Sequence, residues 1–268
     1  MEQRSKKFWR ILKWTFIVYV LVGALLYWLQ DKLLFHPKTL SRDYSFHFSQ
    51  PFVELNLPIS KEHNLNVIRF KVDAASRKGV VLFFHGNKEN VEHYAFYAPL
   101  FTRHGYEVWM MDYPKFGKTT GALKEQTLYA DALILYKMAI AQMPSEKIII
   151  YGKSLGTGVA AQLASVRDCK ELILETPYYN IDTLAKHYFP IYPVVLTRFE
   201  FTTNAHLQTV HAPIYIFHGT DDGVIPYKQS KRLAEECKTA QLITIEGGSH
   251  NDLFRFDVYQ NKMDSLLR

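Results

Sequence analysis

The sequence predicts an α/β fold, with a mostly parallel central sheet, helices on both faces and one preceding transmembrane helix. Three observations support this prediction. From Val80 onward, short apolar runs alternate with longer amphipathic stretches, as expected for a buried parallel sheet with crossover helices. The amino terminus combines a basic cluster with a long uncharged apolar segment. The 268 residues, 48% of them hydrophobic, suit one large domain with a sizeable core.

Most of the excess positive charge lies at the amino terminus. The chain carries 32 basic and 26 acidic side chains, a formal charge of +6. Six basic and two acidic residues fall within residues 1–32, so these contribute +4 and the remaining 236 residues only +2. A nearly neutral domain lacks the basic surface that nucleic-acid binding requires. We therefore expect no nucleic-acid partner.

The uncharged segment Trp14–Leu29 predicts a membrane anchor. Its 16 residues become 19 if it starts at Ile11 with Lys13 at the membrane surface, and a spanning helix needs about 20. We expect residues 1–32 to be a cytoplasmic basic tail and transmembrane anchor. Because the positive charge precedes the segment, the rest of the chain should lie on the extracytoplasmic side, in the periplasm or its equivalent. A cleaved signal peptide and a buried core helix are the alternatives.

Residues 33–268 are expected to form the α/β domain. The first two strands approach an apolar–polar alternation and are separated by a short turn, so they predict an antiparallel edge hairpin. The later strands are almost wholly apolar, as in a sheet covered on both faces. The expected strands are 52–57, 66–72, 80–84, 107–111, 147–151, 171–174, 213–217 and 242–245.

The stretches between these strands have apolar residues at helical spacing. They predict helices at 91–103, 123–141, 155–166, 228–237 and 251–267. Residues 177–212 interrupt the alternation with three prolines and seven aromatic residues, and they are too long for an ordinary loop. We expect a lid-like insertion that covers a bound ligand, and the alternative is an extra packing layer.

A Gly-Lys-Ser-Leu-Gly motif occupies residues 152–156, between an expected strand and an expected helix. This is the context in which G-x-S-x-G forms a tight turn that raises the serine above the sheet. Ser154 is therefore the candidate nucleophile. The amide of Leu155, at a helix amino terminus, is a candidate oxyanion donor. The alternative is a glycine-rich turn with an incidental serine.

A serine nucleophile needs a base, and the base needs an orienting carboxylate. In this architecture the acid and then the histidine follow the serine along the chain. His250, just after the last expected strand, is the candidate base. Asp222 follows the strand before it and is the candidate acid, whereas the adjacent Asp221 and the more distant Glu175 are alternatives. His218 fits a structural role better.

The loop after the first parallel strand should supply the second oxyanion donor. We expect that donor to be the Asn87 amide, with Lys88 as the alternative. His85, in the same loop, is expected to be buried and to brace it.

No cofactor is expected, because the sequence has no P-loop and no dinucleotide-binding glycine pattern. No metal is expected either, because zinc and calcium motifs are missing from the sequence. Cys169 and Cys237 should be buried and unpaired.

These motifs resemble those of the α/β-hydrolase superfamily. More narrowly, the chain is similar to the membrane-anchored single-domain branch that includes the eukaryotic depalmitoylating hydrolases and their bacterial relatives. The matching segments, in the family's order, are His85–Asn87, Gly152–Gly156, Glu175–Pro177, His218–Asp222 and Gly247–His250. The resemblance implies a triad of Ser154, Asp222 and His250, with the amides of Asn87 and Leu155 as the oxyanion hole. Residues 112–121 depart from the family pattern, because they lack its arginine and one glycine.

Together these features predict a serine hydrolase that cleaves a carboxylic ester or thioester through an acyl-enzyme intermediate. The aromatic insertion and the expected membrane anchor favour a small-molecule or lipid-like acyl substrate. The alternatives are an amidase or peptidase, an acyltransferase with the same triad, and an inactive binding protein on the same fold. Nothing in the sequence indicates an oligomeric state.

Overall fold

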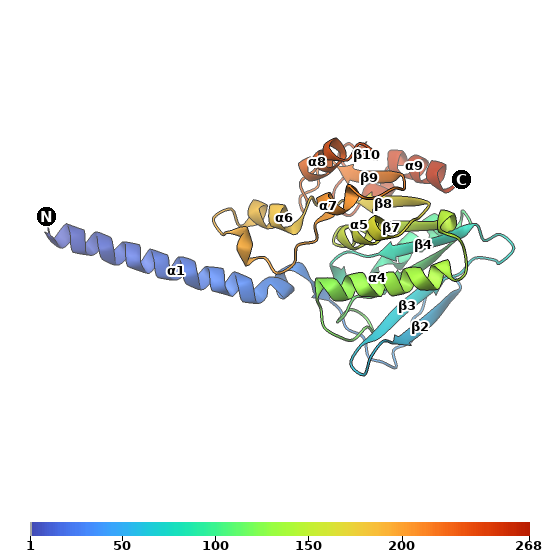
Figure 1. Cartoon of the computed structure of the whole chain (residues 1–268), viewed down its shortest axis with the longest axis horizontal. Helices are drawn as coiled ribbons and strands as arrows, with labels where there is room; N and C mark the ends of the chain where they lie inside the picture. The colour runs from blue at the N-terminus through green and yellow to red at the C-terminus, as the bar shows by residue number, and fades with distance from the viewer. Residues whose placement is uncertain (1) are drawn as a thin grey trace.

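An eight-stranded sheet forms the centre of the protein, whose computed structural model describes residues 2–268 (Figure 1). The strand order is β10-β9-β8-β7-β4-β6-β3-β2. All neighbours from β10 to β6 pair in parallel, whereas β3 is antiparallel to both β6 and β2. The strands are β2 Phe52–Pro58, β3 Asn64–Phe70, β4 Gly79–Phe84, β6 Tyr106–Met111, β7 Ile148–Lys153, β8 Glu171–Glu175, β9 Ile214–Gly219 and β10 Ala240–Ile245. The predicted mostly parallel sheet and its edge hairpin are confirmed.

Helices cover both faces of this sheet. Successive strand residues point to opposite faces, so each central strand contributes to two hydrophobic cores. Val80, Leu82 and Phe84 of β4 belong to one hydrophobic core, and Val81 and Phe83 belong to the other. The first core is covered by α4 Glu125–Ile140, α5 Gly156–Val166, α7 Thr203–Leu207 and α8 Lys228–Glu236. The second is covered by α2 Val91–Tyr94, α3 Ala98–Thr102 and α9 Asp257–Leu267.

Two helices differ from the sequence prediction. The expected helix 91–103 is divided, with a 3₁₀ turn at Ala95–Tyr97 between α2 and α3. Pro99 has no amide hydrogen, so the Ala95 carbonyl accepts from the Ala98 amide in a tighter turn. The expected helix 251–267 begins only at Asp257, because Phe256 is extended.

The cysteines also differ in part from the prediction. Cys237 is buried, but Cys169 is only partly buried, since it lies in the loop that precedes β8. Both thiols are free.

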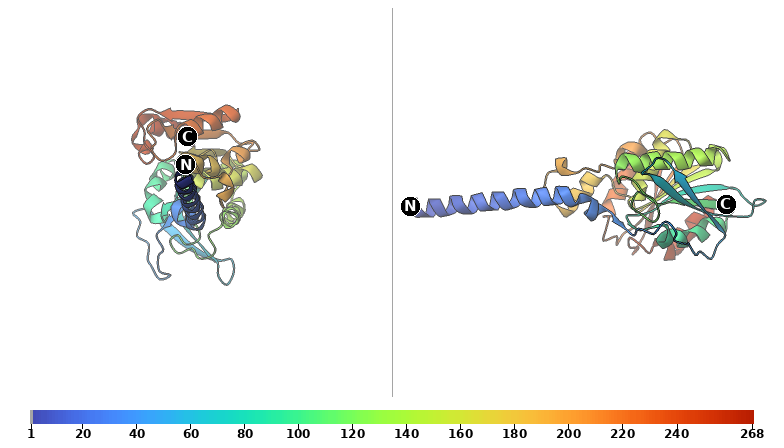
Figure 2. Two further views of the ribbon diagram at one scale, coloured as in Figure 1. Left: turned by 90° about the vertical axis from the view of Figure 1, so that its left-hand side faces the viewer. Right: turned by 90° about the horizontal axis from the view of Figure 1, so that it is seen from below.

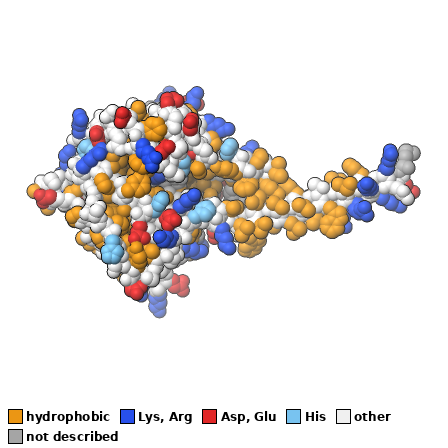
Figure 3. All heavy atoms as spheres, turned by 180° about the vertical axis from the view of Figure 1, so that it is seen from behind, with side chains coloured by type: hydrophobic (Ala, Val, Ile, Leu, Met, Phe, Trp, Pro, Cys, Tyr) orange, Lys and Arg blue, Asp and Glu red, His pale blue; other side chains and the backbone are white. Residues whose placement is uncertain are grey.

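The amino-terminal helix α1, Glu2–Leu34, projects away from the domain (Figures 1 and 2). It is the one helix in residues 2–268 that is long and apolar enough to cross a membrane. Only 6% of its most apolar 18-residue window is buried, so it is not a core helix in this structure. Hydrophobic side chains cover α1 and continue onto the adjoining part of the domain, while basic side chains gather at its far end (Figure 3).

A small two-stranded sheet, which the sequence did not reveal, connects α1 to the domain. Strand β1, His36–Pro37, pairs in parallel with β5, Lys88–Glu89. The amide of the next residue, Lys38, donates to the Glu89 carbonyl oxygen, and the Lys38 carbonyl oxygen accepts from the Gly117 amide. The chain therefore leaves α1 and passes directly along the loop that follows β4.

Candidate active site

Ser154 occupies a sharp turn between β7 and α5. Its φ of 51° lies in the left-handed region, which non-glycine residues rarely adopt. The flanking glycines are sterically required. A Cβ on Gly152 would lie 2.6 Å from the Gly156 carbonyl oxygen, and a Cβ on Gly156 would lie 2.1 Å from that of Phe84. The local sequence can therefore form this turn only because it has glycine at both positions.

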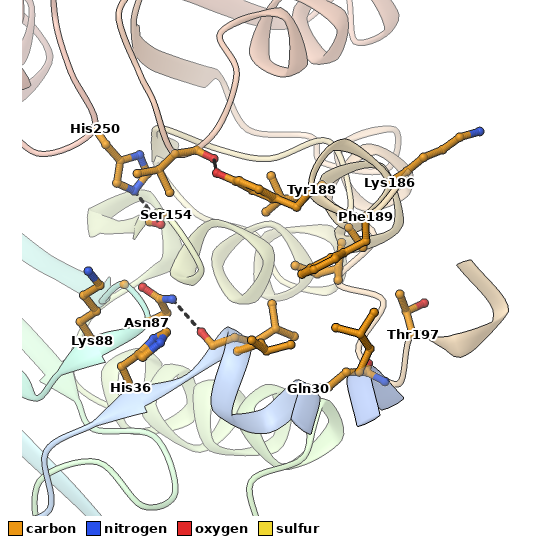
Figure 4. Close-up of a pocket in the computed structure, with 18 of the residues that line it drawn as sticks. Gln30, His36, Asn87, Lys88, Ser154, Lys186, Tyr188, Phe189, Thr197 and His250 are labelled. Atoms are coloured by element: carbon orange, nitrogen blue, oxygen red, sulfur yellow. Dashed lines mark hydrogen bonds between the residues drawn. The ribbon is translucent and has the colours of Figure 1, made fainter. Parts of the chain in front are cut away.

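The structure brings the three predicted side chains Ser154, His250 and Asp222 together. His250 Nε2 lies 2.9 Å from Ser154 Oγ (Figure 4). His250 Nδ1 lies 2.7 Å from Asp222 Oδ2. The neighbouring Asp221 is exposed instead. These residues come from the ends of β7, β9 and β10, which meet at one edge because the strands are parallel.

The Asp222 carboxylate is held by several further donors. The amides of Val224 and Ile225 each donate to Oδ1 at 2.8 Å. His218 Nε2 lies 3.0 Å from Oδ2. Burial opposes ionisation of Asp222, but the hydrogen bonds from His218, His250 and the Ile225 amide outweigh it, so the pKa of this carboxyl lies well below its ordinary value. His218 thus positions the acid, a contact that its i,i+4 spacing to Asp222 could have suggested.

The His250 imidazole is prepared to accept a proton at neutral pH. Burial of the ring lowers its pKa, and the nearby Lys153 charge acts in the same direction. The hydrogen bond and charge of Asp222 act in the opposite direction without cancelling these effects. Neutral His250, with Nδ1–H directed at Asp222, leaves Nε2 free to accept from Ser154.

A buried polar network lies behind the histidine loop. Glu175 is fully buried, and it accepts hydrogen bonds from Lys153 at 2.7 Å, Tyr97 at 2.7 Å, Tyr259 at 2.8 Å and Tyr151. Burial opposes ionisation of Glu175, but the Lys153 charge and these hydrogen bonds keep its pKa below the ordinary value.

Lys153 links this network to the candidate base. Its Nζ also donates to the His250 carbonyl oxygen at 2.9 Å. Glu175, the alternative acid of the sequence analysis, therefore contacts the backbone of His250 through Lys153 and makes no hydrogen bond to the ring. Sequence reasoning overlooked Lys153, because the second position of G-x-S-x-G accepts many residues.

Lys153 provides a test of this electrostatic arrangement. We expect kcat/KM for ester hydrolysis to rise with pH, with an acidic limb centred below about 6.5, the ordinary histidine pKa. Lys153→Gln should move that limb to higher pH, because it removes a positive charge that disfavours protonation of His250. The measurement is the pH dependence of kcat/KM for both proteins.

Lys231→Gln is the matched control, since Lys231 is an exposed lysine of α8. An acidic limb that stays in place in Lys153→Gln, or moves to lower pH, would show that Lys153 has no electrostatic effect on the base.

Two backbone amides border the serine and are free to bind an anion. A Cβ on Gly86 would lie 3.6 Å from Ser154 Cβ, so the loop after β4 runs directly beside the serine. Within residues 2–268, neither the Asn87 amide nor the Leu155 amide donates a hydrogen bond to the protein. Both amides therefore have the free donors expected of an oxyanion hole.

The loop that carries Asn87 is braced from both sides. The buried His85 ring lies 3.3 Å from Asp112 Oδ1 and contacts the Gly86 carbonyl oxygen at 2.7 Å. On the other side, Asn87 Nδ2 donates to the Leu34 carbonyl oxygen at 2.7 Å, and the His36 amide donates to the Asn87 carbonyl oxygen at 2.8 Å. The end of α1 is thus fastened to this loop.

A cavity of about 460 Å³ opens above the serine, between α1 and the insertion. Ser154 and His250 line its inner end (Figure 4). Its other walls are mostly apolar and include Leu26 and Tyr27 of α1 with Leu184, Phe189, Tyr192 and Leu196 of the insertion. No aspartate or glutamate is among the described residues that line it. Nor do residues 2–268 contain a group of three or more His, Cys, Asp or Glu side chains that could hold a metal ion.

The insertion 177–212 has two parts with different surroundings. The residues of the insertion that line the cavity all lie between Ile181 and Thr197, and several of them belong to α6, Ile181–Tyr188. Phe199, Phe201 and Leu207 are buried in the domain core. The insertion therefore forms both a wall of the cavity and a packing layer of the domain.

Sequence comparisons relate the chain to known hydrolases. Residues 75–201 match the family model described as serine aminopeptidase, S33. The chain is 28% identical over 204 residues to alpha/beta hydrolase domain-containing protein 17C of Homo sapiens, covering 72% of this chain and 59% of that protein. It is 30% identical over 191 residues to alpha/beta hydrolase domain-containing protein aho-3 of Caenorhabditis elegans, covering 70% of this chain and 57% of that protein. The matches thus span less than two thirds of these relatives.

Solved structures share the fold at low sequence identity. An esterase of Pyrococcus furiosus matches with a TM-score of 0.68 and 15% identity, covering 87% of this chain and 96% of that one. The thioesterase domain from the curacin biosynthetic pathway matches with a TM-score of 0.59 and 15% identity, covering 82% of this chain and 100% of that one. The sheet order and the turn at Ser154 are consistent with the similarity to these hydrolases. The chain belongs to the α/β-hydrolase superfamily.

Proposed function

We propose that the protein is a serine hydrolase that acts through an acyl-enzyme intermediate. Ser154 Oγ attacks the carbonyl carbon of the substrate while His250 Nε2 takes its proton. Asp222 orients the imidazole and stabilises its charged form. His250 then protonates the leaving group, and water, activated by the same histidine, releases the acid and regenerates Ser154. The amides of Asn87 and Leu155 stabilise the oxyanion of each tetrahedral intermediate.

One observation carries this proposal. The chain of hydrogen bonds from Ser154 through His250 to Asp222, at 2.9 and 2.7 Å, ends in a carboxylate with two amide donors of its own. Nucleophile, base and orienting acid are then within reach of one another, as nucleophilic catalysis requires. An inactive binding protein would have no need of this combination beside two free amides.

We propose a carboxylic ester or thioester with an apolar acyl group as the substrate. The matching family model is described as an aminopeptidase, which makes amide hydrolysis the second candidate. A free substrate amino group needs a carboxylate partner, and the cavity lining described above includes none. The mostly apolar walls instead favour an uncharged acyl chain.

We also propose that α1 is a membrane anchor whose amino terminus faces the cytoplasm, with the catalytic domain on the extracytoplasmic side. The length and exposure of α1 and the basic residues before its apolar segment support this arrangement. Activity of a cytoplasm-specific reporter fused to the carboxyl end would overturn the orientation.

The test of the catalytic proposal combines covalent capture with a substrate pair. A fluorophosphonate probe should label the full-length protein in detergent, and mass spectrometry should place the label on Ser154. An aryl ester should be hydrolysed faster than the aryl amide with the same acyl group. Failure of the probe to react, or its attachment elsewhere, would refute the nucleophile, and faster amide cleavage would refute the preference for esters.

A further inference from the structure

The insertion contacts α1 along one stripe of the helix. The Tyr19 hydroxyl donates to the Ile191 carbonyl oxygen at 3.0 Å, and the Tyr19 and Tyr192 rings stack at 4.9 Å. A Cβ on Gly23 would lie 3.3 Å from the Tyr192 ring. Nearer the domain, the Gln30 side chain donates to the Leu196 carbonyl oxygen at 2.6 Å. Positions 19, 23, 27 and 30 share one helix face, and Figure 2 shows the insertion beside this half of α1.

These contacts place the end of the insertion far along the apolar part of α1. Tyr19 precedes Leu29, the last residue of the uncharged segment, by ten residues, which is about 15 Å along a helix. The hydrocarbon core of a bilayer is about 30 Å thick. If α1 spans a bilayer, Ile191 and Tyr192 lie near its middle.

The composition of the insertion suits that position. Residues 188–197, here called the tip, contain no charged side chain. Ile191 is 70% exposed, and Phe189 and Val194 are also exposed, so the tip presents apolar side chains to its surroundings. Arg198 follows the tip and forms an ion pair with Asp31, two residues beyond the uncharged segment. Arg198 therefore lies level with Asp31, just beyond the uncharged segment of α1.

The tip also satisfies much of its own backbone hydrogen bonding, which a lipid environment demands. The amides of Phe189, Tyr192, Leu196 and Thr197 each donate to a backbone carbonyl within four residues. Pro190 and Pro193 have no amide hydrogen to satisfy. The carbonyls of Ile191 and Leu196 accept from side chains of α1.

We propose that the tip is immersed in the lipid bilayer beside α1, so that the catalytic cavity opens to lipid and α1 is one of its walls. The cavity reaches from Leu26 and Tyr27, within the uncharged segment, to Ser154. An acyl chain can therefore pass from the bilayer to the serine without crossing water. This inference rests on the proposed membrane anchor. The tip would be a second membrane-inserted segment beside that anchor.

Depth-dependent quenching tests the immersion. Single cysteines at Leu21, Ile191 and Lys61, in a background without Cys169 and Cys237, are labelled with an environment-sensitive fluorophore in nanodiscs of zwitterionic lipid. Spin labels near the ends of the lipid chains should quench the probes at positions 21 and 191 and leave the probe at position 61, in the β2–β3 turn, unquenched. Quenching at position 21 alone would overturn the proposal and retain the anchor. Quenching at neither would refute the anchor itself.

A charge substitution tests the consequence for activity. Ile191 is not among the residues that line the cavity, and Ile191→Glu places a carboxylate on the tip. Given the cost of a charge inside a bilayer, the rate on a long-chain aryl ester embedded in nanodiscs should fall about tenfold or more, while the rate on an aryl acetate in detergent stays unchanged. Val258→Glu, which likewise places a glutamate at an exposed β-branched residue but on α9, should affect neither rate.

The two rates separate the possible failures of this test. If Ile191→Glu hydrolyses the embedded ester at the wild-type rate, lateral access from the bilayer is refuted. If it loses the aryl acetate rate equally, the effect is structural and the proposal is likewise refuted. If the wild type hydrolyses neither ester, the proposed function fails.

Discussion

Replacing Ser154 with alanine should lower kcat for ester hydrolysis by roughly 10⁵- to 10⁶-fold, to the level that binding and the oxyanion hole alone provide. The attacking oxygen is lost, and His250 and Asp222 can then only assist water. The fold should survive, because within residues 2–268 the serine hydroxyl makes a hydrogen bond only to His250 Nε2. Turnover of purified, full-length protein with an aryl ester measures the loss, and a thermal unfolding curve checks the fold.

Ser165→Ala is the matched control. This serine is on α5, the helix that follows the Ser154 turn, and its hydroxyl donates to the Gln162 carbonyl oxygen. It should keep wild-type turnover. A Ser154→Ala protein that hydrolyses the ester as fast as the wild type would disprove the proposed nucleophile, whatever the control does.

Asp222→Asn should lower kcat by about 10⁴-fold. An asparagine side chain can donate to His250 Nδ1, which favours the tautomer with the proton on Nε2, so the imidazole cannot accept a proton from Ser154. It also lacks the negative charge that stabilises the imidazolium. The amides of Val224 and Ile225 can still donate to a side-chain oxygen at position 222, so we expect the turn to persist.

The adjacent carboxylate provides an internal control for this experiment. Asp221 is exposed, and among the described residues it makes no hydrogen bond to His250, so Asp221→Asn should leave kcat and KM unchanged. The same aryl ester assay measures both variants. A large loss in Asp221→Asn with little loss in Asp222→Asn would transfer the role of the acid to Asp221.

The local pattern of the sequence predicted most of the fold. Hydrophobic periodicity is a property of neighbouring residues, so strands such as 80–84 and helices such as 155–166 could be placed within one or two residues. The two errors in helix boundaries arise from the backbone conformation at single residues, which hydrophobic periodicity does not reveal. Pro99 divides the expected helix 91–103, and an extended Phe256 delays the last helix.

The candidate site could be named from the sequence for a topological reason. Ser154, Asp222 and His250 each follow a predicted parallel strand, and the carboxyl ends of parallel strands meet at one edge of a sheet. The conformation of the turn after β9 distinguishes Asp222 from Asp221. In the structure, Asp222 is directed at His250 and Asp221 is exposed to solvent.

Other features depend on which distant segments meet in space. The contact of Lys153 with the His250 carbonyl joins residues 97 positions apart, and the bond from Asn87 to Leu34 joins residues 53 positions apart. Neither pair has a local signature, because hydrogen bonds between remote segments follow from packing and not from periodicity.

The sequence by itself determined the alternation of strands and helices, the serine turn with its two glycines, and the order of the candidate acid and base. The tertiary structure alone decided that Lys153 and Glu175 support the histidine loop and that α1 forms a wall of the cavity. The physical reason is that steric and periodic constraints act between near neighbours in the chain. A buried charge network or a shared cavity exists only after the core has brought remote residues together.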